Sequence, residues 1–454
     1  MKVALITPRG AERNTQDLLI REILEILQED IALIGDDTEF VPNLGMLTLA
    51  GLFPEDTELY YLEEEYIPLD RVEEKLFGTR YDLVCFTGYN PQAFRAYELA
   101  EIYRKEGIPT IMGGLHASGI PQEAAQHVDA VVVGEAEDIF HRVLEDLKNN
   151  NLKKIYYSPN QAELSSSPVP RYDIVPNLAL YNKIPLIATR GCPYSCEFCC
   201  FPTTYGRKFR KKPVEQVVEE ILMVRDLHPR PYFSFSDENM LADHRYSKEL
   251  ARAFIPLKID WECYCDISIG EDDELLELLA ESGCRLVQVG LETLDPKNME
   301  NVEPWKADRI EKYPEIIKKI QSYGIPFMGM FIIGMDYDDP GVFRRLYNFI
   351  LETGLAEMDF AILTPMPGTK LFERLKSEGR ILSKNWNHYT WTHVNFRPMK
   401  MSPVELERGM LWLFSRFTRL SARMKEKSGK TPLPFHVIHQ VETGSRANKS
   451  RSEL

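Results

Sequence analysis

The segment Thr189-Arg190-Gly191-Cys192-Pro193-Tyr194-Ser195-Cys196-Glu197-Phe198-Cys199-Cys200 carries the most specific pattern of the chain. Its first three cysteines are separated by three and then by two residues, directly after an apolar stretch. Thiolates at this spacing on one loop can bind three corners of a [4Fe–4S] cube. The fourth iron then has no protein ligand, as a catalytic metal requires. The pattern predicts a cluster held by Cys192, Cys196 and Cys199, with one iron open to a small molecule.

A structural zinc site is the alternative interpretation of these cysteines. Zinc usually takes four ligands in two spaced pairs, and the sequence offers no second pair at a suitable distance. Cys200 directly follows Cys199 and would be a strained fourth ligand, so we expect it to be a small packing residue. The chain has eight cysteines, and we do not expect them to form a disulfide framework in a cytoplasmic chain of this size.

Composition limits the classes of protein to consider. The chain has 454 residues, of which 44% are apolar, enough for two large or three smaller globular domains. The net charge of −15 argues against a nucleic-acid partner, because phosphate binding relies on clustered Lys and Arg. No apolar run reaches the roughly 18 residues that span a bilayer, and the first residues are too short an apolar stretch for a signal peptide. We therefore expect a cytoplasmic protein without a membrane span.

The expected fold class is α/β. Residues 1–150 alternate apolar strands with helical segments such as Gln92–Glu106, which is typical of a doubly wound, Rossmann-like parallel sheet. Ligands bind such sheets at the carboxyl ends of the strands. The strands of this domain are predicted over Lys2–Thr7, Thr57–Leu62, Leu83–Thr87, Thr110–Met112 and Ala130–Val133.

A connector is expected over 151–183, and a second alternating series over 184–384. Its six strand–helix units predict a partial (β/α)6 barrel. The strands are predicted over Leu186–Thr189, Tyr232–Ser236, Trp261–Cys265, Leu286–Val289, Phe327–Ile333 and Asp359–Leu363, and helices over Pro213–Asp226, Asp273–Ser282 and Asp308–Tyr323. A small, mainly helical C-terminal region is expected over 385–454, with a helix over Pro403–Lys425 and a disordered tail after Lys430.

The cysteine spacing, with Arg190-Gly191 before it and Phe198 within it, resembles the signature of the radical S-adenosylmethionine (SAM) superfamily. In that family, SAM chelates the open iron through its amine and carboxylate, and the reduced cluster cleaves it to a 5′-deoxyadenosyl radical. Segments 236–239, 290–293 and 329–334 resemble the family's other SAM-facing segments. The resemblance implies that SAM is bound by Phe198, Asp237, Glu238, Glu292, Ile332 and Gly334.

The first domain resembles the cobalamin-binding domains that are fused to radical SAM cores, on segments 42–47, 113–116 and 129–137. The resemblance implies a cobalamin site formed by Pro42, Leu44, Gly45, Thr87, Gly88, Tyr89, Asn90, Gly113, Gly114, His116, Gly134 and Glu135. The sequence lacks the Asp-x-His-x-x-Gly motif of proteins that ligate cobalt through histidine. We therefore expect His116 to hydrogen-bond the corrin or its tail, and the Tyr89-Asn90 loop to face the corrin near cobalt.

The two cofactors together imply a cobalamin-dependent radical SAM methyltransferase. Such an enzyme transfers a methyl group from methylcobalamin to an unactivated carbon, after the 5′-deoxyadenosyl radical has removed a hydrogen from it. The alternatives are a cyclase or rearrangement enzyme with the same cofactors and, from another class, a non-catalytic iron–sulfur or corrinoid sensor. The substrate stays open among small molecules, lipids and peptides, and we expect flavodoxin or ferredoxin as the electron donor.

Two further groups of residues have open interpretations. Cys263 and Cys265 share one face of a predicted strand with Trp261, so they either pack in a core, which we favour, or reach a substrate inside the barrel. An aromatic group past the barrel is either a substrate lid or packing that covers the barrel end. This group consists of Trp386, His388, Tyr389, Trp391 and His393.

Overall fold

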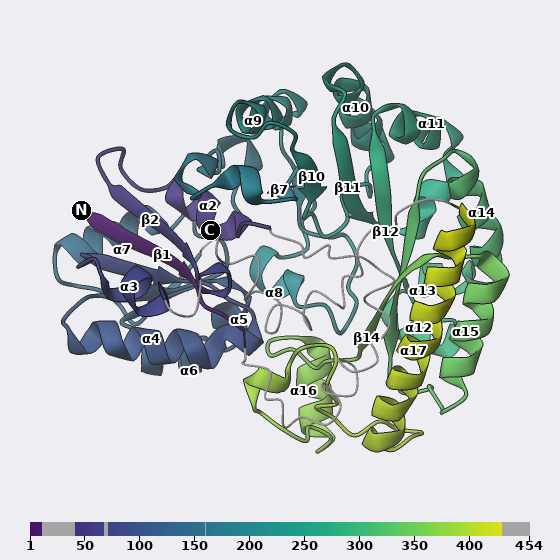
Figure 1. Cartoon of the computed structure of the whole chain (residues 1–454). Coiled ribbons are helices and arrows are strands. Elements are labelled where there is room, and N and C mark those ends of the chain that lie inside the picture. Colours follow the sequence, from purple (N-terminus) through teal and green to yellow (C-terminus); the bar gives the residue numbers. More distant parts are fainter. Residues whose placement is uncertain (11–40, 68–70, 159, 429–454) are drawn as a thin grey trace.

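The computed structural model describes residues 1–10, 41–67, 71–158 and 160–428, and within them two six-stranded parallel sheets lie side by side (Figure 1). The first sheet has the strand order β2-β1-β3-β4-β5-β6. Its strands are β1 (Lys2–Thr7), β2 (Glu58–Glu63), β3 (Leu83–Phe86), β4 (Thr110–Met112), β5 (Ala130–Val133) and β6 (Ile155–Tyr157). Its helices are α2 (Leu44–Ala50), α3 (Val72–Phe77), α4 (Ala93–Lys105), α5 (Gly114–Gly119), α6 (Pro121–His127) and α7 (Phe140–Lys148).

Helices cover both faces of this sheet. Val3 and Leu5 of β1 pack in one core with residues of α2 and α7, whereas Ala4 and Ile6 pack in a second core with residues of α3, α4 and α6. Alternate residues of a strand point to opposite faces, so a central strand buried on both sides is apolar throughout. The predicted doubly wound, Rossmann-like domain is confirmed.

One strand of the first sheet lies where the sequence indicated a connector. Residues Ile155–Tyr157 form β6, which pairs with β5 along the edge of the sheet. Only one of its three residues is buried, so it lacks the continuous apolar run that marks the buried three-residue strand β4. The chain therefore leaves the first sheet after residue 157, a few residues later than the expected boundary at 150.

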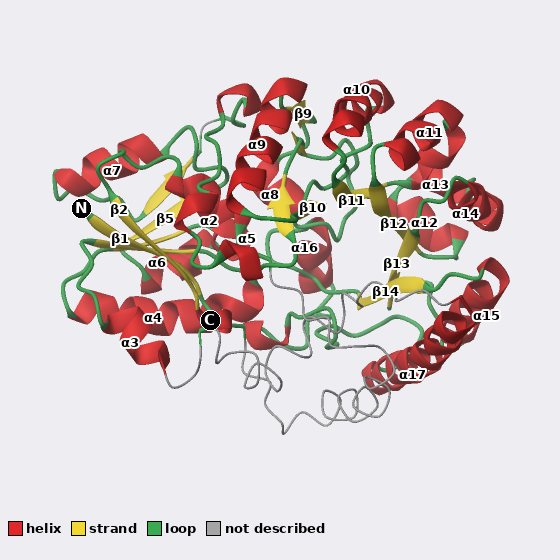
Figure 2. Cartoon of the chain, turned by 45° about the horizontal axis from the view of Figure 1, so that its top comes forward, coloured by secondary structure: helices red, strands yellow, loops and turns green. Residues whose placement is uncertain are grey.

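The second sheet has the order β14-β13-β12-β11-β10-β7, with every neighbouring pair parallel. Its strands trace an arc, and helices lie along the outer side of that arc (Figure 2). This is the predicted partial barrel of six strands. The strands are β7 (Ile184–Leu186), β10 (Tyr232–Phe235), β11 (Asp260–Cys265), β12 (Cys284–Glu292), β13 (Phe327–Ile333) and β14 (Glu357–Ile362). The helices are α9 (Val214–Leu227), α10 (His244–Phe254), α11 (Asp273–Glu281), α12 (Pro296–Val302), α13 (Pro304–Ala307), α14 (Tyr313–Ser322), α15 (Val342–Thr353) and α16 (Lys370–Ser377).

The apolar stretch predicted as one strand over 186–189 is split in the structure. β7 ends at Leu186, and a separate strand β8 (Thr189–Arg190) pairs antiparallel with β9 (Arg210–Lys211). This short hairpin closes the loop that carries the cysteines and α8 (Phe201–Tyr205). In both views α8 lies between the two sheets (Figure 1, Figure 2).

The C-terminal helix α17 (Pro403–Ser428) confirms the helix predicted over 403–425 and packs beside the open edge of the second sheet. Phe414 and Phe417 of α17 form edge-to-face contacts with Phe360 of β14, with ring centroids 5.8 and 5.7 Å apart. Among the described residues, no helix combines the length and the apolar character needed to cross a bilayer. The tail predicted after Lys430 lies outside the described residues.

Candidate active site

A cavity of about 1690 Å³ is lined by residues of both sheets. The turns after β3, β4 and β5 contribute Thr87, Gly113 and Gly134, and the second sheet contributes residues at the carboxyl ends of its strands, such as Glu292. Parallel sheets bind ligands at these ends, so the binding edges of the two domains share one space. The volume exceeds the roughly 300–1,000 Å³ of a pocket for a single drug-sized ligand, so the cavity can hold more than one.

The three cysteines of the predicted cluster line this cavity together. They lie on the loop between β8 and β9, and the backbone N–H of Cys199 donates to the carbonyl of Cys196 at 3.2 Å. Burial raises the pKa of Cys192 to about 11 and that of Cys196 to about 12. Metal binding must therefore supply the free energy that keeps the thiols deprotonated.

The three cysteines do not form a site for a single metal ion. Within the described part of the chain, no three His, Cys, Asp or Glu side chains are placed to bind one metal ion. A cubane needs no such convergence, because each of its thiolates binds a different iron. Cys200 also borders the cavity, but its side chain packs against the second core of the first domain.

Asp237 and Glu238, which follow β10, hold the start of the cysteine loop. The Asp237 carboxylate accepts hydrogen bonds from the backbone of Ala188 at 3.1 Å and from the Thr189 hydroxyl at 2.6 Å, and Glu238 accepts one from the backbone of Gly191 at 2.9 Å. Burial raises the pKa of Asp237 to about 6 and that of Glu238 to about 7. Asp237 is thus already occupied with the strand, whereas an ammonium group beside Glu238 would favour its ionised form.

Glu292 and Lys306 form a buried pair of opposite charge at the cavity wall. The Lys306 ammonium lies 3.5 Å from the Glu292 carboxylate and donates to the carbonyl of Gly290 at 2.9 Å, with side chains only 5% and 13% exposed. A register shift after Gly290 places Glu292 at φ 60°, which turns its side chain away from the regular alternation of β12. An ammonium beside a carboxylate complements a ligand that carries one amine and one carboxylate, as the methionyl end of SAM does.

The sequence did not identify Lys306, because it lies on the four-residue helix α13 without a recognisable motif. The pKa of Lys306 is raised: burial lowers it, but the nearby charges of Glu292, Cys196 and Asp266 outweigh that effect. The lysine is therefore a fixed cation near the cysteine loop. Asp266 was missed as well: it accepts a hydrogen bond at 2.8 Å from Asn239 of the predicted segment 236–239, and both side chains line the cavity.

Two other predicted SAM residues, Phe198 and Ile332, line the cavity, but Gly334 does not. Gly334 has φ 104°, and a Cβ there would lie 2.8 Å from Leu406 of α17. Its backbone N–H donates to Asp338 at 2.9 Å. The structure assigns Gly334 to a tight turn against α17, a position that only glycine tolerates.

Most residues predicted to bind cobalamin line the side of the cavity formed by the first domain. They are Pro42, Leu44, Gly45, Thr87, Gly88, Tyr89, Gly113, Gly114, Gly134 and Glu135. Gly114 has φ 88°, and a Cβ there would lie 2.5 Å from the Thr87 hydroxyl, so the turns after β3 and β4 pack closely. Such glycine turns at strand ends carry no side chains and give a broad surface that fits a large flat ligand such as a corrin.

His116 and Asn90 differ from this expectation, since neither lines the cavity. The His116 Nε2 atom lies 2.7 Å from the Tyr97 hydroxyl, and the ring packs edge-on against Trp386. Burial lowers the pKa of His116 to about 4, so the imidazole is neutral at physiological pH. The structure places this histidine in the packing between α4 and residue 386, directly after Gly114 and Leu115, which line the cavity. Asn90 is buried at the start of the 3-10 turn Asn90–Gln92.

Some side chains of the aromatic group after the barrel pack against the first domain, whereas others face the cavity. Both interpretations of this group, packing and a substrate lid, therefore apply to part of it. Trp386 and Tyr389 are buried in the second core of the first domain, and the Trp386 indole donates to Glu123 of α6 at 2.6 Å. His388, Trp391 and His393 instead line the cavity, where Trp391 contacts the Tyr89 ring. The segment therefore anchors the end of the barrel to the first domain and presents its other side chains to the cavity.

The face of β11 that carries Trp261 and Cys263 packs in the apolar core. The Trp261 ring contacts Phe254 of α10 with centroids 5.6 Å apart, so this face meets the outer helices. The favoured interpretation of Cys263 as a packing residue fits this position. Cys265, the last residue of β11, also reaches the cavity.

Glu63 gives a testable pH dependence of stability. The residue is 8% exposed. Its carboxylate accepts hydrogen bonds from the Asn43 backbone at 2.8 Å and from the Tyr181 hydroxyl at 3.1 Å, and burial raises its pKa from 4.5 to about 7. The Glu63 carboxyl thus binds a proton more tightly in the folded protein than in the unfolded chain. The protonated carboxyl stabilises the fold below pH 4.5, and this contribution to the free energy of unfolding is lost as the pH rises through 7. We expect Glu63→Gln to match the wild type at pH 4 and to be more stable by about 1–3 kcal/mol at pH 8.

Urea unfolding of the apoprotein at both pH values measures this difference. Glu73→Gln, at an exposed position on α3, is the control and should leave the pH profile unchanged. Equal effects of the two substitutions at pH 8 would contradict the assignment.

Comparison with known proteins identifies the two domains. Residues 186–350 match the radical SAM superfamily, and residues 32–144 match the B12 binding domain. The chain is 28% identical over 393 residues to bacteriochlorophyllide d C-12(1)-methyltransferase of Chlorobaculum tepidum, with 85% of each protein covered. It is also 28% identical over 386 residues to bacteriochlorophyllide d C-8(2)-methyltransferase of the same organism, covering 82% of this chain and 84% of the relative.

A solved structure with a similar fold is the radical SAM methyltransferase TsrM from Kitasatospora setae, with cobalamin and a [4Fe-4S] cluster bound. The TM-score is 0.60 at 16% identity, with 83% of this chain and 75% of that chain covered. At this identity the likeness concerns the fold alone. The domains and the shared cavity define a radical SAM enzyme that carries a B12-binding domain.

The chain belongs to the cobalamin-dependent radical SAM enzymes. Its cofactors are a [4Fe–4S] cluster, SAM and cobalamin, as the sequence predicted.

Proposed function

We propose that this enzyme methylates an unactivated carbon of its substrate. The observation that carries the proposal is the single cavity, which is lined by the cluster cysteines, by the Glu292–Lys306 pair and by the glycine turns of the B12-binding domain. When bound, the reduced cluster and SAM supply a 5′-deoxyadenosyl radical, and the corrinoid supplies a methyl group. A substrate carbon held between the two sites can meet both without leaving the protein.

The residues of the chain would act mainly by positioning. Cys192, Cys196 and Cys199 would hold three irons and leave the fourth open to SAM. The Glu292–Lys306 pair would orient the amine and the carboxylate of SAM, because a buried ionic contact is strong and directional. The segment 385–393 would narrow the cavity and limit the access of water to the radical.

Methyl transfer is favoured over the alternatives for two reasons. Cyclases with similar sequences are more distant, since the anaerobic magnesium-protoporphyrin IX monomethyl ester cyclase of Cereibacter sphaeroides is 22% identical to this chain. A sensor that does not turn over SAM has no use for a buried charge pair that complements it. We further propose that the enzyme works in the cytoplasm with flavodoxin or ferredoxin as its reductant.

The substrate can be sought by its products. Reduced holoenzyme is mixed with methyl-labelled SAM and with candidate substrates, beginning with tetrapyrroles such as bacteriochlorophyllide d, on which the relatives act. We expect one substrate to gain a labelled methyl group, with 5′-deoxyadenosine and S-adenosylhomocysteine formed in about equal amounts. Turnover of a substrate with 5′-deoxyadenosine but without S-adenosylhomocysteine would indicate a cyclase or rearrangement enzyme and contradict the proposal.

A further inference from the structure

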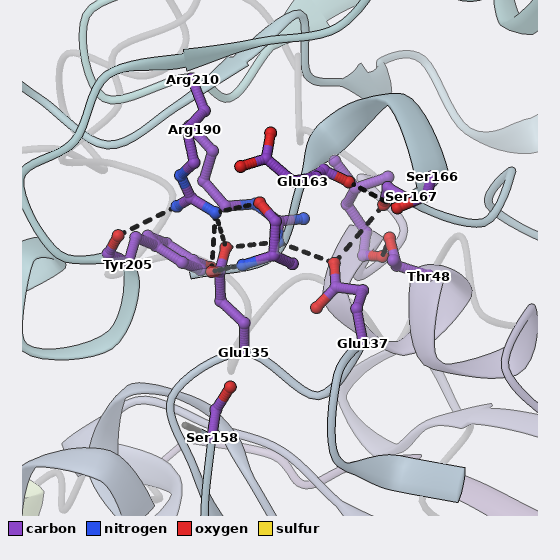
Figure 3. Close-up of polar contacts among 12 residues, drawn as sticks. Thr48, Glu135, Glu137, Ser158, Glu163, Ser166, Ser167, Arg190, Tyr205 and Arg210 are labelled. Carbon is purple, nitrogen blue, oxygen red and sulfur yellow. Dashed lines mark hydrogen bonds and ion pairs between the residues drawn. The ribbon is translucent and has the colours of Figure 1, made fainter. Parts of the chain in front are cut away.

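A buried group of two arginines and two glutamates joins the two cofactor domains (Figure 3). Glu135 and Glu137 follow β5 of the B12-binding domain, whereas Arg190 and Arg210 lie on the hairpin that closes the cysteine loop. The Arg190 guanidinium lies 2.7 Å from both carboxylates, and Arg210 lies 2.7 Å from Glu135. All four side chains are at most 10% exposed, so the contacts are screened little by solvent.

The hairpin depends on the carboxylate from the other domain. Arg190 and Arg210 are directly opposite each other across β8 and β9. Like charges at such a cross-strand position repel, and burial away from water makes an unpaired charge costly. Glu135 contacts both guanidinium groups and thereby compensates the repulsion. Without this carboxylate, the base of the cysteine loop would hold two adjacent positive charges, of which Arg190 would keep its ion pair with Glu137.

The same group also fixes the far end of the cysteine loop. Arg210 donates to the carbonyl of Tyr205, the last residue of α8, at 2.9 Å, and the Arg190 guanidinium lies over the Tyr205 ring at 5.4 Å. Glu135 and Arg210 further bond to the backbone of Ala162 in the connector, at 2.8 and 2.6 Å. The strand before the cysteines, the helix after them and the connector therefore converge on this group of charged side chains, with Glu135 bound to both arginines (Figure 3).

On the side of the B12-binding domain, Glu135 directly follows a turn that lines the cavity. Gly134 has φ 83°, and its backbone N–H donates to the Ser118 hydroxyl at 3.1 Å. The Gly134 turn belongs to the surface that fits the corrin. Gly134 thus lines the expected cobalamin site, and the next residue, Glu135, contacts the base of the cluster loop.

We propose that Glu135 is a positioning residue that fixes the cobalamin site and the cluster loop relative to each other, so that radical formation and methyl transfer stay coupled. Its carboxylate acts at the domain contact and needs no contact with either cofactor. The part that concerns methyl transfer rests on the proposed function, whereas the part that concerns cofactor geometry does not.

The test compares Glu135→Gln with the wild type in holoenzyme loaded with all three cofactors. The first readout is the magnetic interaction between cob(II)alamin and the reduced cluster, seen by electron paramagnetic resonance. We expect this interaction to be uniform in the wild type and broadened in the variant, with both cofactors still bound. The second readout is the amount of 5′-deoxyadenosine formed per methylated product, which we expect to rise about tenfold.

Glu64→Gln is the matched control. Glu64 is also a buried carboxylate held by two arginines, Arg95 at 2.5 Å and Arg9 at 3.8 Å, but all three belong to the B12-binding domain. We expect it to lower stability without changing either readout. Glu137→Gln removes the carboxylate that contacts Arg190 alone, so we expect it to change both readouts in the same direction as Glu135→Gln but by less. This second variant tests the proposal if Glu135→Gln does not fold.

An unchanged magnetic interaction in the variant that folds would overturn the proposal. So would an equal change in Glu64→Gln, because the effect would then reflect general destabilisation. If no substrate is methylated by the wild type, the proposed function fails, and the magnetic readout still decides the role of Glu135.

Discussion

Alanine in place of Cys199 is expected to abolish the formation of 5′-deoxyadenosine. The thiolate binds one iron of the cluster, and with two ligands left on the loop the cubane has no stable attachment. We expect the anaerobically reconstituted variant to lose most of its iron and sulfide, and its SAM cleavage to fall by a factor of roughly 1,000 or more. Iron and sulfide analysis, with chromatography of 5′-deoxyadenosine, measures both effects.

Cys200→Ala is the matched control, because its thiol is adjacent in sequence and also borders the cavity. We expect it to keep about four irons and four sulfides per chain and near-normal SAM cleavage. If Cys200→Ala lost the cluster and Cys199→Ala retained it, the ligand set would be wrong.

Lys306→Met is expected to weaken SAM binding by about 100-fold. The substitution keeps the length of the side chain but removes the ammonium, so the Glu292 carboxylate and the carboxylate of SAM would share a buried site without a cation. Removing one partner of a buried charge pair costs about 2–5 kcal/mol, and about 3 kcal/mol corresponds to two orders of magnitude in affinity. Calorimetric titration of the reconstituted protein with SAM under anaerobic conditions measures the dissociation constant.

Lys318→Met provides the control, since Lys318 is exposed on α14. It should leave the SAM affinity within a factor of about two. If Lys306→Met bound SAM as tightly as the wild type does, the ion pair of Lys306 with Glu292 would have no part in binding SAM. A loss of the cluster in Lys306→Met would point instead to a role in folding of the loop, so iron content is measured in the same samples.

The features with a strict spacing or a long period could be predicted from the sequence. The cysteine motif required no tertiary information, and five strands of each sheet were recognised near their observed bounds because the buried parallel strands are continuous apolar runs. β6 was missed because only one of its three residues is buried. The split between β7 and β8 was missed because it falls inside one apolar stretch, where the sequence pattern shows no break.

The contacts that the sequence did not reveal join segments that are distant along the chain. Lys306 becomes part of the site only because α13 packs beside the bulge at Glu292, which lies more than ten residues earlier in the chain. His116 was assigned to the corrin by resemblance, but its orientation is decided by Tyr97 on another helix. Glu135 was expected at the cobalamin surface, and only the folded chain reveals its contacts with Arg190 and Arg210.

The most direct test of the central claim is to remove cobalamin from the reduced enzyme that holds the cluster and SAM. The claim is that one cavity uses SAM in two ways, as a radical source at the cluster and as a methyl source for cobalamin. With cobalamin present, we expect both 5′-deoxyadenosine and S-adenosylhomocysteine. Without cobalamin, 5′-deoxyadenosine should persist and S-adenosylhomocysteine should disappear. S-adenosylhomocysteine that forms equally well without cobalamin, or 5′-deoxyadenosine that never forms, would contradict the claim.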